Sequence, residues 1–138
     1  MTLSRSHYRL FLALGIALMV ALGLGSKAYG GIGARWVNNY SGDIVYEVFW
    51  IWLVGWVWPR CQAWRVAIAV FTLTAIIEFT QLIPFPSAWQ THILWRLLLG
   101  TSFSWWDFPY YAIGSVFGGW SLAYLQQQCK ARHQLPKG

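Results

Sequence analysis

The chain has 138 residues, of which 57% are hydrophobic and only 10% are charged, and its formal net charge is +6. A soluble domain of this size usually carries about 25% charged residues, so these long apolar runs exclude an ordinary soluble protein and predict one integral membrane domain over residues 1–138. The ten Lys and Arg residues are scattered at the ends of apolar segments, as membrane anchors are, so we expect no nucleic acid as a partner.

Four apolar segments predict an all-α, polytopic membrane fold. A helix needs about 20 residues to cross roughly 30 Å of hydrocarbon, and four stretches reach or approach that length. The first two are short unless their flanking residues extend them. We expect membrane spans at about residues 10–25, 44–58, 66–83 and 108–125.

The first segment has two interpretations. Arg5 and Arg9 precede its apolar stretch, and "SKA" at 26–28 resembles a small-residue cleavage site, which together is a signal-peptide pattern. We favour a retained helix, because small residues recur every four positions and would form a ridge on one face that another helix can approach closely. The residues of this predicted ridge are Ala13, Ala17, Ala21 and Gly25.

The basic residues predict the orientation, because they are enriched on the cytoplasmic side of membrane helices. With the N-terminus inside, the cytoplasmic side receives Arg5, Arg9, Arg60, Arg65, Lys130, Arg132 and Lys137. The opposite side receives Lys27, Arg35 and Arg96. We therefore expect both termini in the cytoplasm. Cys61 and Cys129 would then face a reducing compartment, where a disulfide is not expected.

The connection between the third and fourth spans predicts an additional helix. Ser87 and Gln90 make a capping pattern after two prolines, and Gly100 is a typical C-terminal signal. The apolar stretch between them is too short to span, so we expect an interfacial or re-entrant helix at about residues 88–99. His92 and Arg96 are four residues apart and share a face of this helix.

The fourth span contains small residues at a spacing of four. Gly114 pairs with Gly118 and Ser115 pairs with Gly119, a pattern that favours close helix packing. Most of the eleven tryptophans flank the predicted spans, as expected of an aromatic belt at the membrane interfaces.

All four acidic residues, Asp43, Glu47, Glu78 and Asp107, lie within or beside apolar segments. The predicted topology places all of them in the extracytoplasmic half. A carboxylate at membrane depth costs about 2.5–3.5 kcal/mol on insertion scales, so it must pair, stay protonated or have a function. We therefore predict a polar cluster with a binding role, composed of Lys27, Asp43, Glu47, Glu78, Gln81, His92, Arg96 and Asp107.

The cluster also has structural interpretations. Glu78 can pair with Arg96 or Lys27 simply to fix helix packing. Asp107 and Asp43 lie at predicted helix starts, where a carboxylate interacts favourably with the helix dipole. Capping does not account for Glu47, which lies one turn deeper. Proton or ion handling is a further alternative for Glu78.

The sequence shows no pattern of catalytic or cofactor-binding residues. His92 is the one histidine away from the termini, so we expect no metal site, and no serine or cysteine motif indicates a hydrolase. We expect no cofactor and a non-enzymatic protein whose partners are membrane lipids and, in one alternative, other membrane proteins.

Four stretches in this order resemble a family of small bacterial integral membrane proteins known as a domain of unknown function: "ALGLGSK" at 21–27, "GDIVYE" at 42–47, "EFTQL" at 78–82 and "WRLLLGTSFSWWDFPYYAIGSVFG" at 95–118. This resemblance implies a four-helix fold in a bacterial cytoplasmic or other internal membrane. It also highlights Lys27, Asp43, Glu78, Gln81, Arg96 and Asp107. The order E-x-x-Q, Arg, then Asp before a Gly-rich helix is also similar to VanZ-like proteins, which are associated with glycopeptide (teicoplanin) resistance.

Three functions follow as hypotheses. In the first, the protein binds an anionic lipid or polyprenyl-phosphate head group, with Arg96, Lys27 and Arg35 holding phosphate while Glu78 and Asp107 orient those cations. In the second, it is an accessory subunit of a larger membrane complex and the cluster is structural. In the third, it is a small transporter or a lipid-processing enzyme that uses Glu78 as acid or base.

Overall fold

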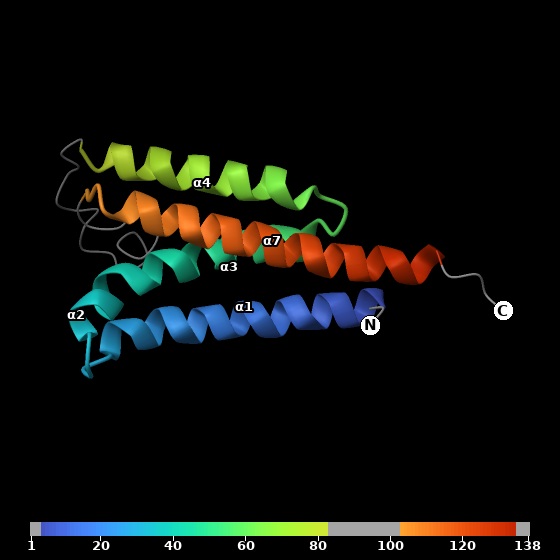
Figure 1. Cartoon of the computed structure of the whole chain (residues 1–138), viewed down its shortest axis with the longest axis horizontal. Coiled ribbons are helices and arrows are strands. Elements are labelled where there is room, and N and C mark those ends of the chain that lie inside the picture. The colour runs from blue at the N-terminus through green and yellow to red at the C-terminus, as the bar shows by residue number, and fades with distance from the viewer. Residues whose placement is uncertain (1–3, 83–102, 135–138) are drawn as a thin grey trace.

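The computed structural model describes residues 4–82 and 103–134, and in these ranges every regular element is a helix (Figure 1). The elements are α1 (Arg5–Ala28), the short α2 (Ala34–Trp36), the π-helical turn η1 (Val37–Ser41), α3 (Gly42–Val57), α4 (Ala63–Thr80) and α7 (Asp107–Gln134). The all-α prediction is confirmed for this part of the chain. The helix predicted at 88–99 lies outside the described residues.

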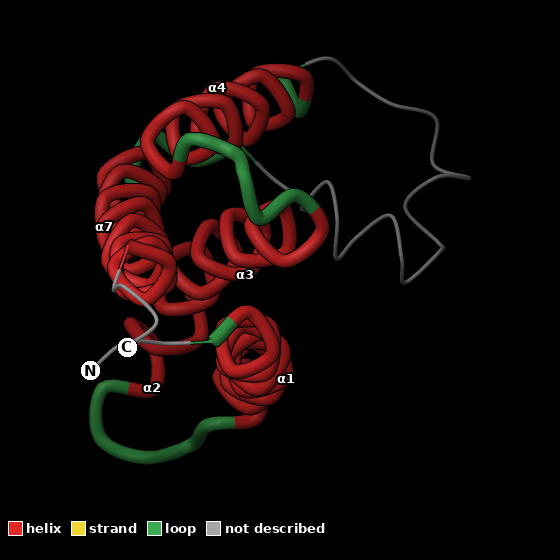
Figure 2. The backbone as a smooth tube through the Cα atoms, turned by 90° about the vertical axis from the view of Figure 1, so that its right-hand side faces the viewer, coloured by secondary structure: helices red, strands yellow, loops and turns green. Residues whose placement is uncertain are grey.

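The long helices run side by side, and α7 lies between α4 and α1 with α3 behind it (Figure 1). Figure 2 shows the same bundle nearly end-on, with α3 in the centre, α4 above it, α7 at the left and α1 below. α3 contacts α1, α4 and α7, while α4 packs on α7 and α3. The start of α1 and the end of α7 lie at one end of the bundle (Figure 1). The C-terminal end of α4, the N-terminal end of α7 and α2 lie at the other end (Figure 1).

The glycines of α7 allow its close approach to two neighbouring helices. A Cβ atom added to Gly114 would lie 2.7 Å from the carbonyl oxygen of Ile44 in α3. One added to Gly118 would lie 2.9 Å from Ile51 Cδ1, and one added to Gly119 would lie 2.9 Å from Ala67 Cβ in α4. Each distance is too short for a real side chain, so the predicted close packing of this helix is confirmed.

α1 packs on α3, but with a different face from the one predicted. Tyr8 and Leu12 are buried, Tyr8 donates a hydrogen bond to the carbonyl oxygen of Gly55 (3.1 Å), and Gly15 leaves the space that the Trp52 ring occupies. The predicted ridge is exposed instead: Ala13, Ala17, Ala21 and Gly25 face outward. Burial of a tyrosine and a leucine removes more apolar area from water than burial of alanines, and this determines the rotation of α1.

Two described helices, α1 and α4, are long and apolar enough to cross a membrane. α1 begins earlier than predicted because Ser4 caps it, its hydroxyl oxygen accepting a hydrogen bond from the His7 amide (3.2 Å). The spans predicted at 44–58 and 108–125 correspond to α3, which has 16 residues, and to the first part of α7, where tyrosines, tryptophans and glycines lower the hydropathy. For these two helices, membrane crossing stays a prediction.

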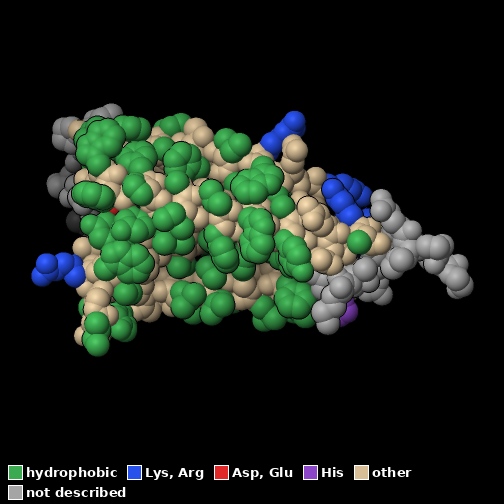
Figure 3. All heavy atoms as spheres, viewed as in Figure 1, with side chains coloured by type: hydrophobic (Ala, Val, Ile, Leu, Met, Phe, Trp, Pro, Cys, Tyr) green, Lys and Arg blue, Asp and Glu red, His purple; other side chains and the backbone are tan. Residues whose placement is uncertain are grey.

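The sides of the bundle carry many exposed apolar side chains. Leu14 of α1, Ile68 of α4 and Val116 of α7 are each at least 60% exposed. On the face that Figure 3 shows, hydrophobic side chains cover the middle of the molecule, and Lys and Arg side chains lie toward its two ends. An apolar surface this continuous exceeds the patches usual on soluble monomers and favours contact with lipid or protein.

Candidate functional site

Six polar residues form a two-level arrangement inside the bundle, which we call the polar column. Three helices each contribute two of them, four positions apart, and residues at this spacing share a helix face. The outer level, toward the end of the bundle where α7 begins, consists of Asp43, Glu78 and Tyr111. The inner level, one turn deeper, consists of Glu47, Thr74 and Ser115.

Glu78 organises the outer level. Its carboxylate oxygen Oε1 accepts a hydrogen bond from the backbone amide of Ser104 (2.8 Å). The second oxygen, Oε2, accepts hydrogen bonds from Gln81 Nε2 (3.0 Å) and from the Tyr111 hydroxyl (3.3 Å). One buried carboxylate thus joins the end of α4 to the start of α7. This gives Glu78 a structural role whether or not it also binds a ligand.

Glu47 dominates the inner level. Its side chain is completely buried, and its oxygen Oε2 accepts a hydrogen bond from the Ser115 hydroxyl (2.6 Å). Its other oxygen, Oε1, and the Asp43 oxygen Oδ2 are buried without a hydrogen-bond partner among the described residues. Buried polar atoms are nearly always hydrogen-bonded, so two open carboxylate oxygens on one helix call for an explanation.

The column ends at apolar residues one to two turns below its inner level. Ile51 of α3 and Leu122 of α7 are completely buried, and Val70 of α4 is 9% exposed. At Gly118, α7 packs directly against Ile51, which leaves no room for even one added carbon atom. The six column residues therefore lie toward one end of the bundle, and these apolar residues separate them from the buried Tyr8 hydroxyl at the other end.

Lys27 is a basic residue, within the described part of the chain, whose positive charge acts on the column residue Asp43. Its ammonium donates a hydrogen bond to the carbonyl oxygen of Asn38 (2.7 Å) and attracts the carboxylates of Asp43 and Asp107 electrostatically. Within the described part of the chain, Lys27 thus acts on two of the four carboxylates. His92 and Arg96 lie outside the described residues, so the pairing of Arg96 with Glu78 or Asp107 stays a prediction.

The capping interpretation fits Asp107 but is wrong for Asp43. Asp107 is the first residue of α7, where the helix dipole favours a negative charge. Asp43 follows a backbone that is already helical through α2 and η1, and Ser41 makes no side-chain capping bond there. The amides ahead of Asp43 belong to a continuous helix, so Asp43 has no free helix end to stabilise.

The structure places Lys27, Gln81 and all four acids at one end of the bundle, while their role in binding stays a prediction. Sequence reasoning missed Tyr111 as a column residue and treated Ser115 only as a small packing residue. The sequence did contain a signal for both residues: Tyr111 and Ser115 are four positions apart, as are Asp43 and Glu47, and Thr74 and Glu78.

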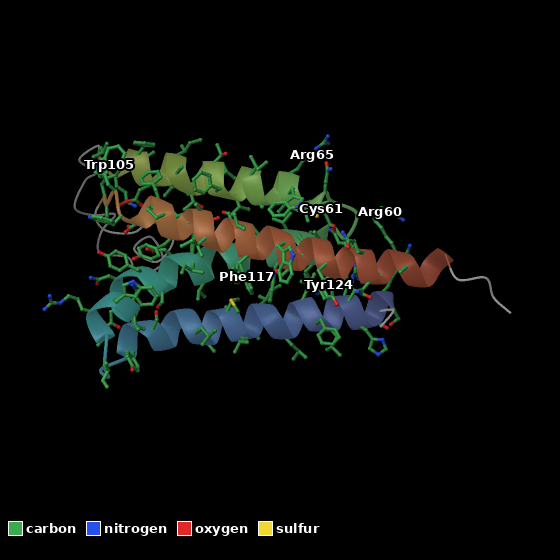
Figure 4. All side chains as sticks on the ribbon, viewed as in Figure 1. Arg60, Cys61, Arg65, Trp105, Phe117 and Tyr124 are labelled. Atoms are coloured by element: carbon green, nitrogen blue, oxygen red, sulfur yellow. The ribbon has the colours of Figure 1, made fainter. Side chains whose placement is uncertain are left out.

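Aromatic rings surround this end of the bundle. The Phe79, Trp105 and Phe108 rings lie between 5.4 and 6.1 Å from one another. On the other side, Tyr110 stacks on Tyr40 at 4.7 Å and accepts a hydrogen bond from Trp36 Nε1 (3.0 Å). Figure 4 shows Trp105 at this end, whereas Arg60, Cys61 and Arg65 lie toward the opposite end.

A comparison with protein-family models shows that the column lies in a region that this chain shares with one family. Residues 32–115 match the family described as "Protein of unknown function (DUF2809)". The chain belongs to this family. The match includes all six column residues of this DUF2809 protein, whereas α1 and the C-terminal part of α7 lie outside it. No solved structure matches the chain. The predicted resemblance to an uncharacterised family is confirmed, and the similarity to VanZ-like proteins stays a prediction.

Proposed function

We propose that this DUF2809 protein is a non-enzymatic, multi-pass membrane protein whose polar column binds the phosphate-bearing head group of a membrane lipid. The observation that carries the proposal is the closed end of the column. Polar residues enter an apolar bundle from one end and stop at the layer of Ile51, Val70 and Leu122. Such a site suits a ligand that approaches and leaves from the end of the bundle where α7 begins. A transport path would need to continue through that layer.

The side chains around the end of the bundle where α7 begins support a lipid as the ligand. With the apolar sides of the bundle in hydrocarbon, the exposed rings of Trp36, Trp105 and Trp106 lie where aromatic residues anchor membrane proteins, at the level of the lipid head groups. Head groups are therefore the most abundant ligands near the column. The distribution of basic residues supports an extracytoplasmic position for this end of the column, in a bacterial cytoplasmic or other internal membrane.

The phosphate would be held by cations at the rim. Lys27 at the end of α1 and Arg35 in α2 supply positive charge at this end, and Arg96 is our candidate from the remainder of the chain. Glu78 and Asp107 would orient these cations. An arginine is suited to this role because its guanidinium can meet a phosphate with two parallel hydrogen bonds.

Native mass spectrometry of the protein, extracted in a mild detergent, tests the proposal. We expect a retained phospholipid on the wild type and its loss in Lys27→Gln. Lys130→Gln removes the same charge at the other end of the bundle and should retain the lipid. Thermal stability measured for both variants separates a lost ligand from a lost fold. A wild-type protein without lipid, or equal retention by both variants, would contradict lipid binding.

A second candidate function rests on the outward face of α1. The exposed small residues Ala13, Ala17, Ala21 and Gly25 are suited to close contact with a helix of another membrane protein. The protein would then be a subunit of a larger complex, and the polar column would only hold its own helices together. Stoichiometric co-purification of a partner protein without retained lipid would favour this function over the first.

A further inference from the structure

The two open carboxylate oxygens of the polar column lie on one face of α3. Asp43 Oδ2 and Glu47 Oε1 are both buried and without a hydrogen-bond partner among the described residues, and Glu47 itself is completely buried. The remaining Glu47 oxygen is fixed by the Ser115 hydroxyl at 2.6 Å. The Thr74 hydroxyl lies beside Glu47 but donates its hydrogen to the Val70 carbonyl oxygen (3.0 Å), so the two open oxygens lack donors within the part of the chain that the structure describes. A ligand that completes this site brings N–H or O–H groups, and positive charge suits the two carboxylates.

The spacing of the two residues suits one small donor. Residues four apart on a helix are displaced by about 6 Å along its axis. The two N–H groups of one ammonium diverge at the tetrahedral angle, so two charge-assisted hydrogen bonds of about 2.7–2.9 Å bridge acceptors about 4.4–4.7 Å apart, a separation that two side chains leaning toward one another can reach. A primary ammonium carries three N–H donors and can make both bonds at once, with a third toward the outer level.

Resting on the proposed lipid-binding function, we infer that Asp43 and Glu47 bind the primary ammonium of an aminophospholipid head group of the phosphoethanolamine type. The charges around the column agree with this ligand. A purely anionic head group would meet four carboxylates against Lys27 and Arg35 in the described part of the chain. A zwitterionic head group brings one charge for each kind of partner: its ammonium faces the column, and its phosphate faces Lys27 at the rim.

Other cations fit this site less well. The described residues contain no group of three or more Asp, Glu, His or Cys side chains that could hold a metal ion. A quaternary ammonium is cationic but has no N–H donor, so it would leave both oxygens open. This difference separates recognition by hydrogen bonds from simple charge attraction, and it can be measured with lipids that differ only in methylation.

The test uses the delipidated full chain in detergent, titrated with single lipids and followed by native mass spectrometry. The lipids are phosphatidylethanolamine, its monomethyl and dimethyl forms, phosphatidylcholine and phosphatidylglycerol. We expect phosphatidylethanolamine to bind at least about tenfold more tightly than phosphatidylcholine or phosphatidylglycerol, with affinity falling at each methylation, because each methyl group removes a charge-assisted hydrogen-bond donor. Glu47→Gln and, separately, Asp43→Asn should abolish this preference, while Thr72→Val on the outer face of α4 should keep it.

The outcomes separate this inference from the function on which it rests. Equal binding of phosphatidylethanolamine and phosphatidylcholine, or a preference that survives in both carboxylate variants, would overturn ammonium recognition. Tighter binding of phosphatidylglycerol would also overturn it but would leave lipid binding standing. Absence of binding by every lipid would refute both. Asp43→Asn, at the partly accessible outer level, provides a readout should Glu47→Gln fail to fold.

Discussion

Gly114→Ala tests whether the contact between α7 and α3 determines the geometry of the polar column. Gly114 has ordinary helical backbone, so the substitution introduces no backbone strain of its own. The added Cβ would lie 2.7 Å from the carbonyl oxygen of Ile44, 3.0 Å from its Cα and 2.8 Å from the Cβ of Glu47. Two of these atoms belong to the backbone, so a side-chain rotation cannot relieve the overlap. α7 must move away from α3.

The size of the effect follows from two opposing contributions. Overpacking of a tight contact usually costs about 1–3 kcal/mol. Alanine is more favourable than glycine inside a helix by about 0.8–1.0 kcal/mol, which offsets part of that cost. We therefore expect Gly114→Ala to lower the free energy of unfolding by about 0–2 kcal/mol, a change of up to about thirtyfold in the ratio of folded to unfolded protein. The Ser115–Glu47 hydrogen bond should weaken with the same displacement.

The assay is reversible unfolding in mixed detergent micelles, followed by tryptophan fluorescence. Gly25→Ala is the matched control, because Gly25 lies in α1 and a Cβ added there meets nothing within 4 Å. This control should keep the gain in helix propensity without the clash and should be neutral or slightly stabilised. If both variants change the free energy of unfolding by the same amount, the close contact at Gly114 does not hold α7 against α3.

Two further predictions concern the inner level of the column and the topology. Ser115→Ala should lower the free energy of unfolding by about 1–3 kcal/mol, because it leaves a completely buried carboxylate without its donor. The control Thr72→Ala removes an exposed hydroxyl and should change the free energy of unfolding by less than about 0.5 kcal/mol. Similar values for the two variants would contradict a buried Ser115–Glu47 interaction. With both termini in the cytoplasm, a membrane-impermeant maleimide should leave Cys129 and Cys61 unlabelled in intact cells and should label them after permeabilisation. Labelling of Cys129 in intact cells would contradict the predicted topology. Burial raises the pKa of the Cys61 thiol, so after permeabilisation its labelling should be slow at neutral pH and accelerate as the pH rises.

Local patterns in the sequence were sufficient for the four long helices of the described residues and for the close packing of one of them, but not for α2 and η1. Apolar runs of membrane length predict four helices because a backbone in hydrocarbon must satisfy its own hydrogen bonds. The small residues of the fourth span predict the contact observed at Gly114, Gly118 and Gly119. The spacing of four between Asp43 and Glu47 places both on one face whatever surrounds them.

The tertiary structure alone decided which helix faces meet. The alanine ridge of α1 and the face containing Tyr8 and Leu12 both had a regular spacing, and only the packing of α1 on α3 selected the second. In the same way, Ser115 became the donor to Glu47 because α7 approaches α3 at Gly114. Periodicity fixes which residues share a face, but the rotation of each helix depends on the area buried against its neighbours, which are distant in sequence. The sequence therefore determined the polar residues, and the packing of three helices determined that they form one column with a closed end.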